Sequence, residues 1–334
     1  MHSPDTPTLD ETSLPRRSRA SRPTSALAAL SLSVIFVASV LVASITPAGS
    51  ADAPSSTTAL QKAIKAGAKL TSLPSTTTPT LSQDVGVQEL GGPMFPVRCV
   101  AESQSQTTAP ICPLGDTTSH KTMVLLGDSQ AHMWAPAFIA IAEAQHERLI
   151  VLAKDACPPW LTTYLTTGMS PFPQCTAFHS WSLAEIKKLH PAQIYVTGAE
   201  GPLGVSSIDL KPVTSLLNDL RKISPSTTVL SNIPWPTNDP VTCLSAHSSN
   251  IGGCNMPDGE FNSLYGKFHK TLKEAAKSSG ANFANLDSLF CTKSTCPVVV
   301  ADHLVYYDDY HITWQYADYV ATALDQMLSS TFKS

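Results

Sequence analysis

From about residue 97 onward, short apolar runs alternate with longer stretches whose apolar residues recur every three or four positions. The short runs are apolar at successive positions, which is typical of parallel strands that are covered on both faces. They lie at residues 123–126, 149–152, 194–196, 228–233 and 283–286. The helical stretches lie at residues 134–146, 181–189, 213–223, 261–279 and 313–328.

This alternation predicts an α/β fold, a three-layer α/β/α sandwich in which helices cover both faces of the sheet. The sheet should be mostly parallel and have about five strands, as in flavodoxin-like proteins. Ligands of such folds bind at the carboxyl ends of the strands. Residues that carry chemistry are therefore expected directly after the apolar runs.

The first 50 residues follow a different pattern. An apolar, uncharged run of 20 residues at 26–45 comes after a cluster of four arginines, Arg16, Arg17, Arg19 and Arg22. A run of this length can span a bilayer as one helix, with the positive flank in the cytoplasm. Ala48-Gly49-Ser50 would also suit signal cleavage. The segment is thus either a single-pass membrane anchor or a signal sequence, and the remaining chain lies outside the cytoplasm.

Four segments follow from these patterns. Residues 1–24 are polar and predict a disordered cytoplasmic tail, and residues 25–46 form the anchor or signal. Residues 47–96 are rich in Ser, Thr and Pro and predict a linker with a short helix near 60–70. Residues 97–334 then form one globular domain.

Composition and charge exclude several classes of function. Charged residues make up 14% of the chain, the formal net charge is −4, and no basic stripe suits a nucleic-acid backbone. The sequence contains no glycine-rich phosphate-binding motif, so nothing in it indicates a nucleotide cofactor. His303 and Asp302 have no further ligands at suitable spacing, so we predict no metal site and no cofactor.

The eight cysteines all follow the apolar N-terminal run, and an even number in an exported chain predicts disulfides. A metal cluster is disfavoured because no Cys-x-x-Cys spacing is present. Spacing alone cannot determine the pairing, but the cysteines form four neighbouring couples, which we expect to be bonded. These couples are Cys99 and Cys112, Cys157 and Cys175, Cys243 and Cys254, and Cys291 and Cys296.

A serine stands at the end of the first predicted strand, in Gly127-Asp128-Ser129. Its hydroxyl would lie at the carboxyl edge of the sheet, near backbone N–H groups that can stabilise an oxyanion. The alternative is an ordinary strand-to-helix turn in which Asp128 and Ser129 only cap the helix. We expect that helix to begin a few residues later.

A second polar stretch precedes the last predicted helix. A serine hydroxyl needs an imidazole to accept its proton, and the imidazole needs a carboxylate to orient it. Asp308 and His311 lie three apart in one loop and could supply both groups. Asp309 is the competing carboxylate, and we expect it to point elsewhere.

Together these stretches resemble the SGNH (GDSL) hydrolase superfamily. More narrowly, residues 58–330 are similar to the SGNH domain fused to, or partnered with, acyltransferase-3 type membrane proteins, which O-acetylate surface polysaccharides. The resemblance implies the SGNH hydrolase fold, with Ser129 as nucleophile, His311 as general base and Asp308 as its orienting partner. It rests on five blocks: Gly127-Asp128-Ser129-Gln130-Ala131-His132 with Trp134, Cys157-Pro158-Pro159, Asn232-Ile233-Pro234-Trp235-Pro236, Cys291 with Cys296-Pro297, and Asp308-Asp309-Tyr310-His311-Ile312-Thr313.

The chain departs from the wider superfamily at its oxyanion donors. The glycine after the second strand and the asparagine after the third are both missing here. The remaining candidates are the backbone N–H groups of Ser129, Gln130 and Gly198. Position 130, commonly histidine in the subgroup, is glutamine, which leaves the neighbour of Ser129 uncharged. His132 we expect on the first helical turn, half exposed.

The resemblance implies a serine-dependent O-acyltransferase outside the cytoplasm that acts on cell-surface carbohydrate. An esterase that removes acyl groups from a glycan would use the same triad, and a catalytically silent glycan-binding module is the third alternative. One membrane span cannot carry an activated acyl group across the bilayer. A transferase of this type would therefore need a multi-span membrane partner that delivers the acyl group.

Overall fold

The computed structural model describes residues 52–84, 90–160, 173–199, 210–236 and 238–331. They belong to one compact unit, Ala48–Ser334. The predicted tail and the predicted apolar segment at 25–46 lie outside the described residues. Among the residues that are described, no helix has both the length and the apolar character needed to cross a membrane.

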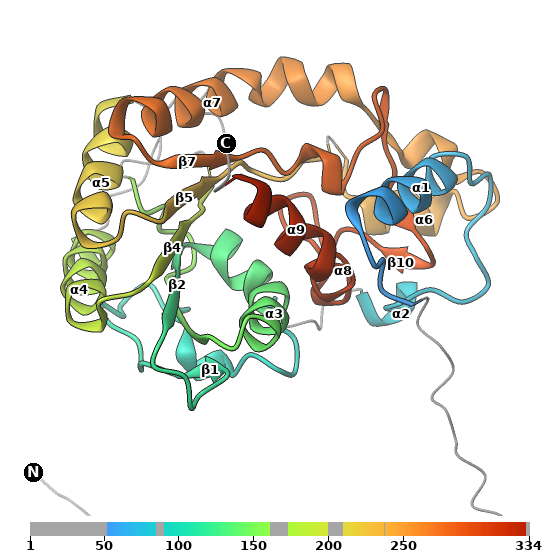
Figure 1. Ribbon diagram of the computed structural model, residues 1–334. Coiled ribbons are helices and arrows are strands. Elements are labelled where there is room, and N and C mark those ends of the chain that lie inside the picture. Colours follow the sequence, from blue (N-terminus) through green and yellow to red (C-terminus); the bar gives the residue numbers. More distant parts are fainter. Residues whose placement is uncertain (1–51, 85–89, 161–172, 200–209, 237, 332–334) are drawn as a thin grey trace, which may run out of the picture. The chain divides into compact units, whose positions relative to one another are not determined.

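A mostly parallel sheet of six strands forms the centre of this unit (Figure 1). Five strands are parallel and coincide with the five apolar runs of the sequence. The sixth, β1, has two residues and pairs antiparallel with β3 at the edge, which is too short to leave a pattern in the sequence. In sheet order the strands are β1 (Leu114–Gly115), β3 (Arg148–Ala153), β2 (Thr122–Gly127), β4 (Gln193–Val196), β5 (Thr227–Leu230) and β7 (Asn282–Ala284).

Helices cover both faces of this sheet (Figure 1). Side chains of β2 alternate between the faces: Met123 and Leu125 join one hydrophobic cluster, whereas Val124 and Leu126 join the other. The first cluster contains residues of α3 (Ser129–Ala144), α8 (Trp314–Tyr319) and α9 (Ala321–Thr331). The second contains residues of α4 (Pro173–Leu189), α5 (Leu210–Ile223) and α7 (Asp258–Ser279).

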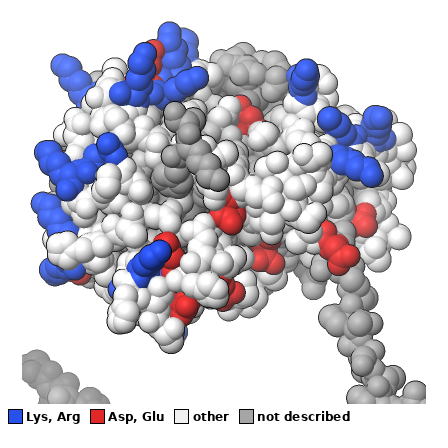
Figure 2. All heavy atoms as spheres, viewed as in Figure 1, with Lys and Arg blue, Asp and Glu red and all other residues white. Residues whose placement is uncertain are grey.

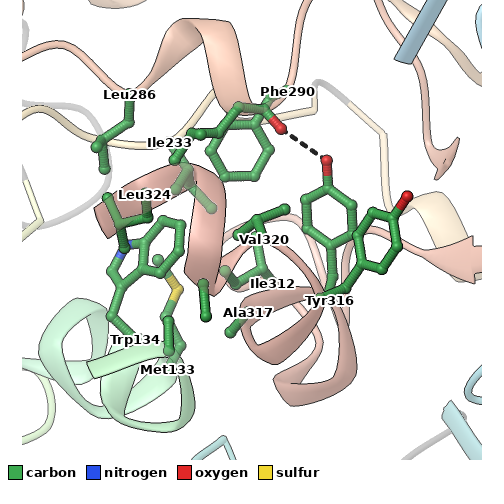
Figure 3. Packing of buried hydrophobic residues seen from close by; sticks show 14 of the residues in the cluster. Met133, Trp134, Ile233, Leu286, Phe290, Ile312, Tyr316, Ala317, Val320 and Leu324 are labelled. Atoms are coloured by element: carbon green, nitrogen blue, oxygen red, sulfur yellow. Dashed lines mark hydrogen bonds between the residues drawn. The ribbon is translucent and has the colours of Figure 1, made fainter. Parts of the chain in front are cut away.

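The last predicted helix, 313–328, is two helices in the structure. Helix α8 ends at Tyr319, Val320 caps it, and α9 begins at Ala321. Val320 and Leu324 belong to the same buried cluster as Trp134 of α3 (Figure 3). The short step between the helices keeps both in contact with α3.

The segment at 47–96, for which composition predicts a linker, contains helix α1 (Thr57–Gly67). The side chains of Leu60 and Ile64 are fully buried in the first cluster, and α1 contacts α9. Shorter elements complete the described chain. They are α2 (Leu81–Asp84), η1 (Val97–Cys99), α6 (Pro240–Ala246), η2 (Ile251–Cys254), β6 (Met256–Pro257), η3 (Asp287–Leu289), β8 (Thr295–Cys296), β9 (Val299–Val300) and β10 (His303–Leu304).

All eight cysteines are joined in four disulfides, which fit a domain outside the cytoplasm. Each bond links neighbouring cysteines along the chain, across 5 to 18 residues. The pairs are Cys99–Cys112, Cys157–Cys175, Cys243–Cys254 and Cys291–Cys296.

Charged side chains are distributed unevenly over the surface. Figure 2 shows lysines and arginines gathered over α4, α5 and α7 and again over α1, while much of the face between them is uncharged. Lysines of α4, α5 and α7 pair with acidic residues on their own helices, Lys188 with Glu185, Lys222 with Asp219 and Lys270 with Glu274.

Candidate active site

The carboxyl end of β2 brings a serine to the amino end of α3. At Gly127 any side chain would collide with the carbonyl oxygen of Thr197, so glycine is required where β2 passes β4. Helix α3 begins at Ser129, not a few residues later as expected, because Asp128 already acts as its N-cap. Ser129 thus lies where backbone N–H groups and the helix dipole favour negative charge.

Asp128 is fully buried and links two neighbouring strand ends. Its Oδ1 accepts the N–H of Gln130 at 2.9 Å, and its Oδ2 accepts the N–H of Ala199 at 2.8 Å. Burial raises the pKa of Asp128 to about 6, although both hydrogen bonds act against this rise. The carboxyl group therefore holds the loop after β4 against the turn that carries Ser129.

The structure brings Ser129, His311 and Asp308 together in a hydrogen-bonded series. His311 Nε2 lies 2.9 Å from Ser129 Oγ, and His311 Nδ1 lies 2.9 Å from Asp308 Oδ2. Asp308 Oδ1 accepts the backbone N–H groups of Tyr310 and His311, each at 2.7 Å, which fixes the tight turn. Asp308, and not its neighbour Asp309, supplies the carboxylate that faces the imidazole.

The contact between Asp308 and His311 shifts the pKa values of both residues. Burial lowers the pKa of His311, but the hydrogen bond and negative charge of Asp308 outweigh it, and the pKa is raised. For Asp308, burial raises the pKa, yet the hydrogen bond and charge of His311 outweigh it and the pKa is lowered. An imidazole held beside a carboxylate can accept a proton from a hydroxyl and remain stabilised afterwards.

Gln130 joins the two halves of the site, a role that its position in the sequence did not reveal. Its buried side chain donates from Nε2 to the carbonyl oxygen of Tyr310 at 3.0 Å, across 180 positions of the chain. The residue beside the serine therefore fastens the loop that carries the histidine. Only the loss of charge at position 130 was evident from sequence.

The three predicted oxyanion donors differ in what they contact. The Gln130 N–H donates to Asp128, as described. The N–H groups of Ser129 and Gly198 have no acceptor within the described part of the chain. Gly198 precedes Ala199, whose N–H is held by Asp128. A side chain at position 198 would collide with Pro159, so the close packing of this backbone on Pro159 requires glycine.

His132 lies on the first turn of α3 as expected, but it is buried and not half exposed. Its ring packs edge-on against Phe95, and its Nδ1 lies 3.4 Å from Asp155 Oδ1. With Glu102 these residues bring potential metal ligands within 4.8 Å of one another. Asp155 is thus the polar neighbour of the buried His132 ring.

The tryptophans that flank these motifs are mostly core residues. Trp134 and Trp160 are fully buried. Trp235 follows β5, and its indole meets the ring of Tyr310 edge-on with centroids 5.0 Å apart. It therefore packs on the loop that carries His311.

Solved structures of similar proteins share low sequence identity with this chain. The periplasmic domain of a lipopolysaccharide acetyltransferase from Salmonella ser. Paratyphi A has 14% identity and a TM-score of 0.46, over 64% of this chain and 84% of its own. A family two carbohydrate esterase from Clostridium thermocellum, in complex with cellohexaose, has 12% identity and a TM-score of 0.39, over 67% and 66%. An acetyl-xylooligosaccharide esterase from Geobacillus has 10% identity and a TM-score of 0.38, over 63% and 94%.

Among curated proteins, none matches this sequence. The family model described as "SGNH domain (fused to AT3 domains)" matches residues 98–326, which include every motif of the site described above. The chain therefore belongs to the SGNH family, in the group whose domains are fused to AT3 domains, and is an enzyme of the acyltransferase or carboxylic ester hydrolase type.

Proposed function

We propose that this protein is a serine-dependent O-acyltransferase that transfers an acyl group, in the first place acetyl, to cell-surface carbohydrate. The observation that carries the proposal is the series Ser129 Oγ, His311 Nε2, His311 Nδ1 and Asp308 Oδ2, in which each contact is 2.9 Å. This is the arrangement that activates a serine hydroxyl as a nucleophile.

The first half of the reaction forms an acyl-enzyme. His311 Nε2 accepts the proton of the Ser129 hydroxyl while Ser129 Oγ attacks the acyl carbonyl carbon. The N–H groups of Ser129 and Gly198 are the donors proposed for the resulting oxyanion, helped by the amino end of α3. When the tetrahedral intermediate collapses, the bond to the donor oxygen breaks and His311 returns the proton to that oxygen.

The second half releases the acyl group. An acceptor hydroxyl gives its proton to His311 and its oxygen attacks the acyl carbonyl carbon, after which Ser129 leaves and regains a proton. A sugar hydroxyl as acceptor gives transfer, whereas water gives hydrolysis. Family membership with domains that are fused to AT3 domains supports transfer. A carbohydrate acetylesterase with the same triad is the alternative.

The proposed setting is outside the cytoplasm. Four disulfides support an oxidising compartment. The apolar run at 26–45 is proposed as the membrane anchor, or as a signal that is removed. A multi-span membrane acyltransferase is the partner proposed to deliver the acyl group.

Active-site labelling tests the nucleophile. The purified full chain should react with a fluorophosphonate probe, and Ser129→Ala should not. A matched serine variant, Ser288→Ala in η3, should label as the wild type does. Labelling that survives Ser129→Ala would reject Ser129 as the nucleophile, and a wild type that never labels would favour a glycan-binding module.

Product analysis separates transfer from hydrolysis. The wild type is supplied with p-nitrophenyl acetate, with and without an oligosaccharide acceptor, and the products are identified by mass spectrometry. Acetylated sugar that depends on Ser129 supports the transferase. Free acetate as the sole product, at an unchanged rate with acceptor present, supports the esterase.

A further inference from the structure

A polar cavity of about 460 Å³ lies between the segment after β5 and the turns around η2. This volume falls within the range of roughly 300–1,000 Å³ that is usual for small-molecule sites. Its walls come from three stretches that the sequence separates. The lining residues are Pro236 and Asn238, then Cys243, and then Gly252, Gly253, Cys254, Asn255, Met256 and Pro257.

One ring contact connects the edge of the cavity to the loop that carries His311. Trp235, the neighbour of the lining residue Pro236, packs edge-on against Tyr310 at 5.0 Å, and Tyr310 directly precedes His311. On the other side, Asp239 caps the amino end of α6 next to the lining residue Asn238. Burial raises the pKa of Asp309, the charge of Asp308 raises it further, and the charge of Asp239 has a smaller effect in the same direction.

The lining chemistry favours an uncharged, hydroxyl-rich ligand. Among the lining residues that the structure describes there is no Lys, Arg, His, Asp or Glu. Asn238 and Asn255 supply side-chain amides, which can both donate to and accept from sugar hydroxyls. Asn255 Oδ1 accepts the N–H of Val298 at 3.2 Å, which holds this amide in place.

The cavity is also braced. The Cys243–Cys254 disulfide joins two of its walls, with Cα atoms 5.8 Å apart. Gly252 and Gly253 leave this wall without side chains, and the Gly252 carbonyl accepts the N–H of Asn255. A preformed wall binds with little loss of conformational entropy.

We propose that this cavity binds a neutral sugar residue of the glycan whose hydroxyl exchanges the acyl group at Ser129. The inference rests on the proposed function, because it names the substrate class of that same site. An uncharged lining would leave a uronate or phosphate group without a cationic partner, so anionic glycans are excluded as preferred substrates.

The test adds bulk to the cavity lining and leaves the triad unchanged. At Gly253 an added Cβ would meet no atom within 4 Å, and the backbone is outside the left-handed region, so Gly253→Trp should fold. Gly266 of α7 has equal room but lies outside the lining, which makes Gly266→Trp the matched control. Asn238→Ala is a second variant that removes an amide and adds no bulk.

The probes are p-nitrophenyl acetate, which is too small to need the cavity, and acetylated neutral tetrasaccharides of xylose, glucose and N-acetylglucosamine. Acetylated tetragalacturonate is the anionic comparison. Deacetylation of these substrates requires the sugar to bind in the cavity, whether the enzyme normally transfers the acyl group or hydrolyses the ester. For Gly253→Trp we expect kcat/KM on the preferred neutral tetrasaccharide to fall about tenfold or more, with p-nitrophenyl acetate changed by less than about twofold.

Asn238→Ala should lower the same kcat/KM by about fivefold, and Gly266→Trp should leave both substrates at wild-type rates. Neutral-substrate activity that survives Gly253→Trp would overturn the inference. So would a preference for the galacturonate, or hydrolysis of p-nitrophenyl acetate with no activity on any neutral tetrasaccharide. Failure of the proposed function looks different, because the wild type would then also leave p-nitrophenyl acetate intact.

Discussion

His311 Nε2 lies 2.9 Å from Ser129 Oγ although 182 positions separate the two residues. One side of this contact is set by β2 and the N-cap of α3, and the other by a turn that Asp308 closes through two backbone hydrogen bonds. Ile312, the next residue, is buried in the hydrophobic cluster that Figure 3 shows. In the same cluster the Tyr316 hydroxyl donates to the Leu289 carbonyl at 2.6 Å. The core therefore anchors the loop on which the imidazole depends.

The carboxylate partner of His311 can be identified by substitution. Asp308→Asn should lower the rate of fluorophosphonate labelling by about 10³–10⁴-fold, because the imidazole loses the anion that orients and stabilises it. Asp309→Asn is the matched control and should stay near the wild-type rate. Equal losses in both variants would contradict the assignment of Asp308.

The rate of labelling should depend on the charge of His311. Only the neutral imidazole accepts a proton, and the pKa of His311 is raised above its ordinary value, so labelling should increase with pH through that raised pKa. In Asp308→Asn the increase of the residual rate with pH should shift to lower pH. Without the Asp308 charge, burial lowers the pKa of His311 with less opposition. The check is the labelling rate between about pH 5 and pH 9. An acid limb that stays at the same pH in the variant would show that His311 is not the titrating group.

Asp128 should leave a signature in the pH dependence of stability. Its pKa is raised from 3.8 to about 6 on folding, so the folded state binds more protons than the unfolded state between these values. The free energy of unfolding should therefore fall as the pH rises through this window. In Asp128→Asn this fall should be smaller, measured as the difference in urea unfolding between about pH 4 and pH 7. An identical difference in both proteins would mean that Asp128 does not titrate there.

Gln130 should act as a positioning residue. Gln130→Leu removes the hydrogen bond from Nε2 to the Tyr310 carbonyl, worth about 1 kcal/mol, so labelling should slow about fivefold. The acid limb of the pH profile should stay unchanged, because the pair of Asp308 and His311 is intact. The exposed Gln104 provides the control Gln104→Leu. A displaced acid limb in Gln130→Leu would point to a role in proton transfer instead.

Removal of disulfides should destabilise the domain in the order of the loops that they close. Cys157 and Cys175 are 18 residues apart, and Cys291 and Cys296 only 5. Loop entropy gives a loss of about 3 kcal/mol for the first double serine variant and about 2 kcal/mol for the second. Denaturant unfolding of the full chain measures both, with the wild type as reference. The reverse order would show that native contacts, and not loop entropy, dominate.

Much of the fold could be read from the pattern of apolar residues. The five parallel strands coincide with the predicted runs because buried strands are apolar at successive positions. The two-residue strand β1 and the break between α8 and α9 were missed, since neither is long enough to change the local periodicity. Helix α3 begins earlier than expected because Asp128 alone caps it, which makes Ser129 already its first helical residue.

The sequence by itself determined the α/β class, the likeness to the SGNH family, and the residue types Ser129, Asp308 and His311 as candidates, because these follow from local periodicity and motifs. Only the tertiary structure decided that these side chains meet, that His132 is buried, and that Gln130 fastens the opposite loop. Each of these facts is a contact between segments that lie far apart along the chain. Such contacts depend on how the strands are connected and how the helices pack, and local sequence patterns do not show which distant segments come together in space.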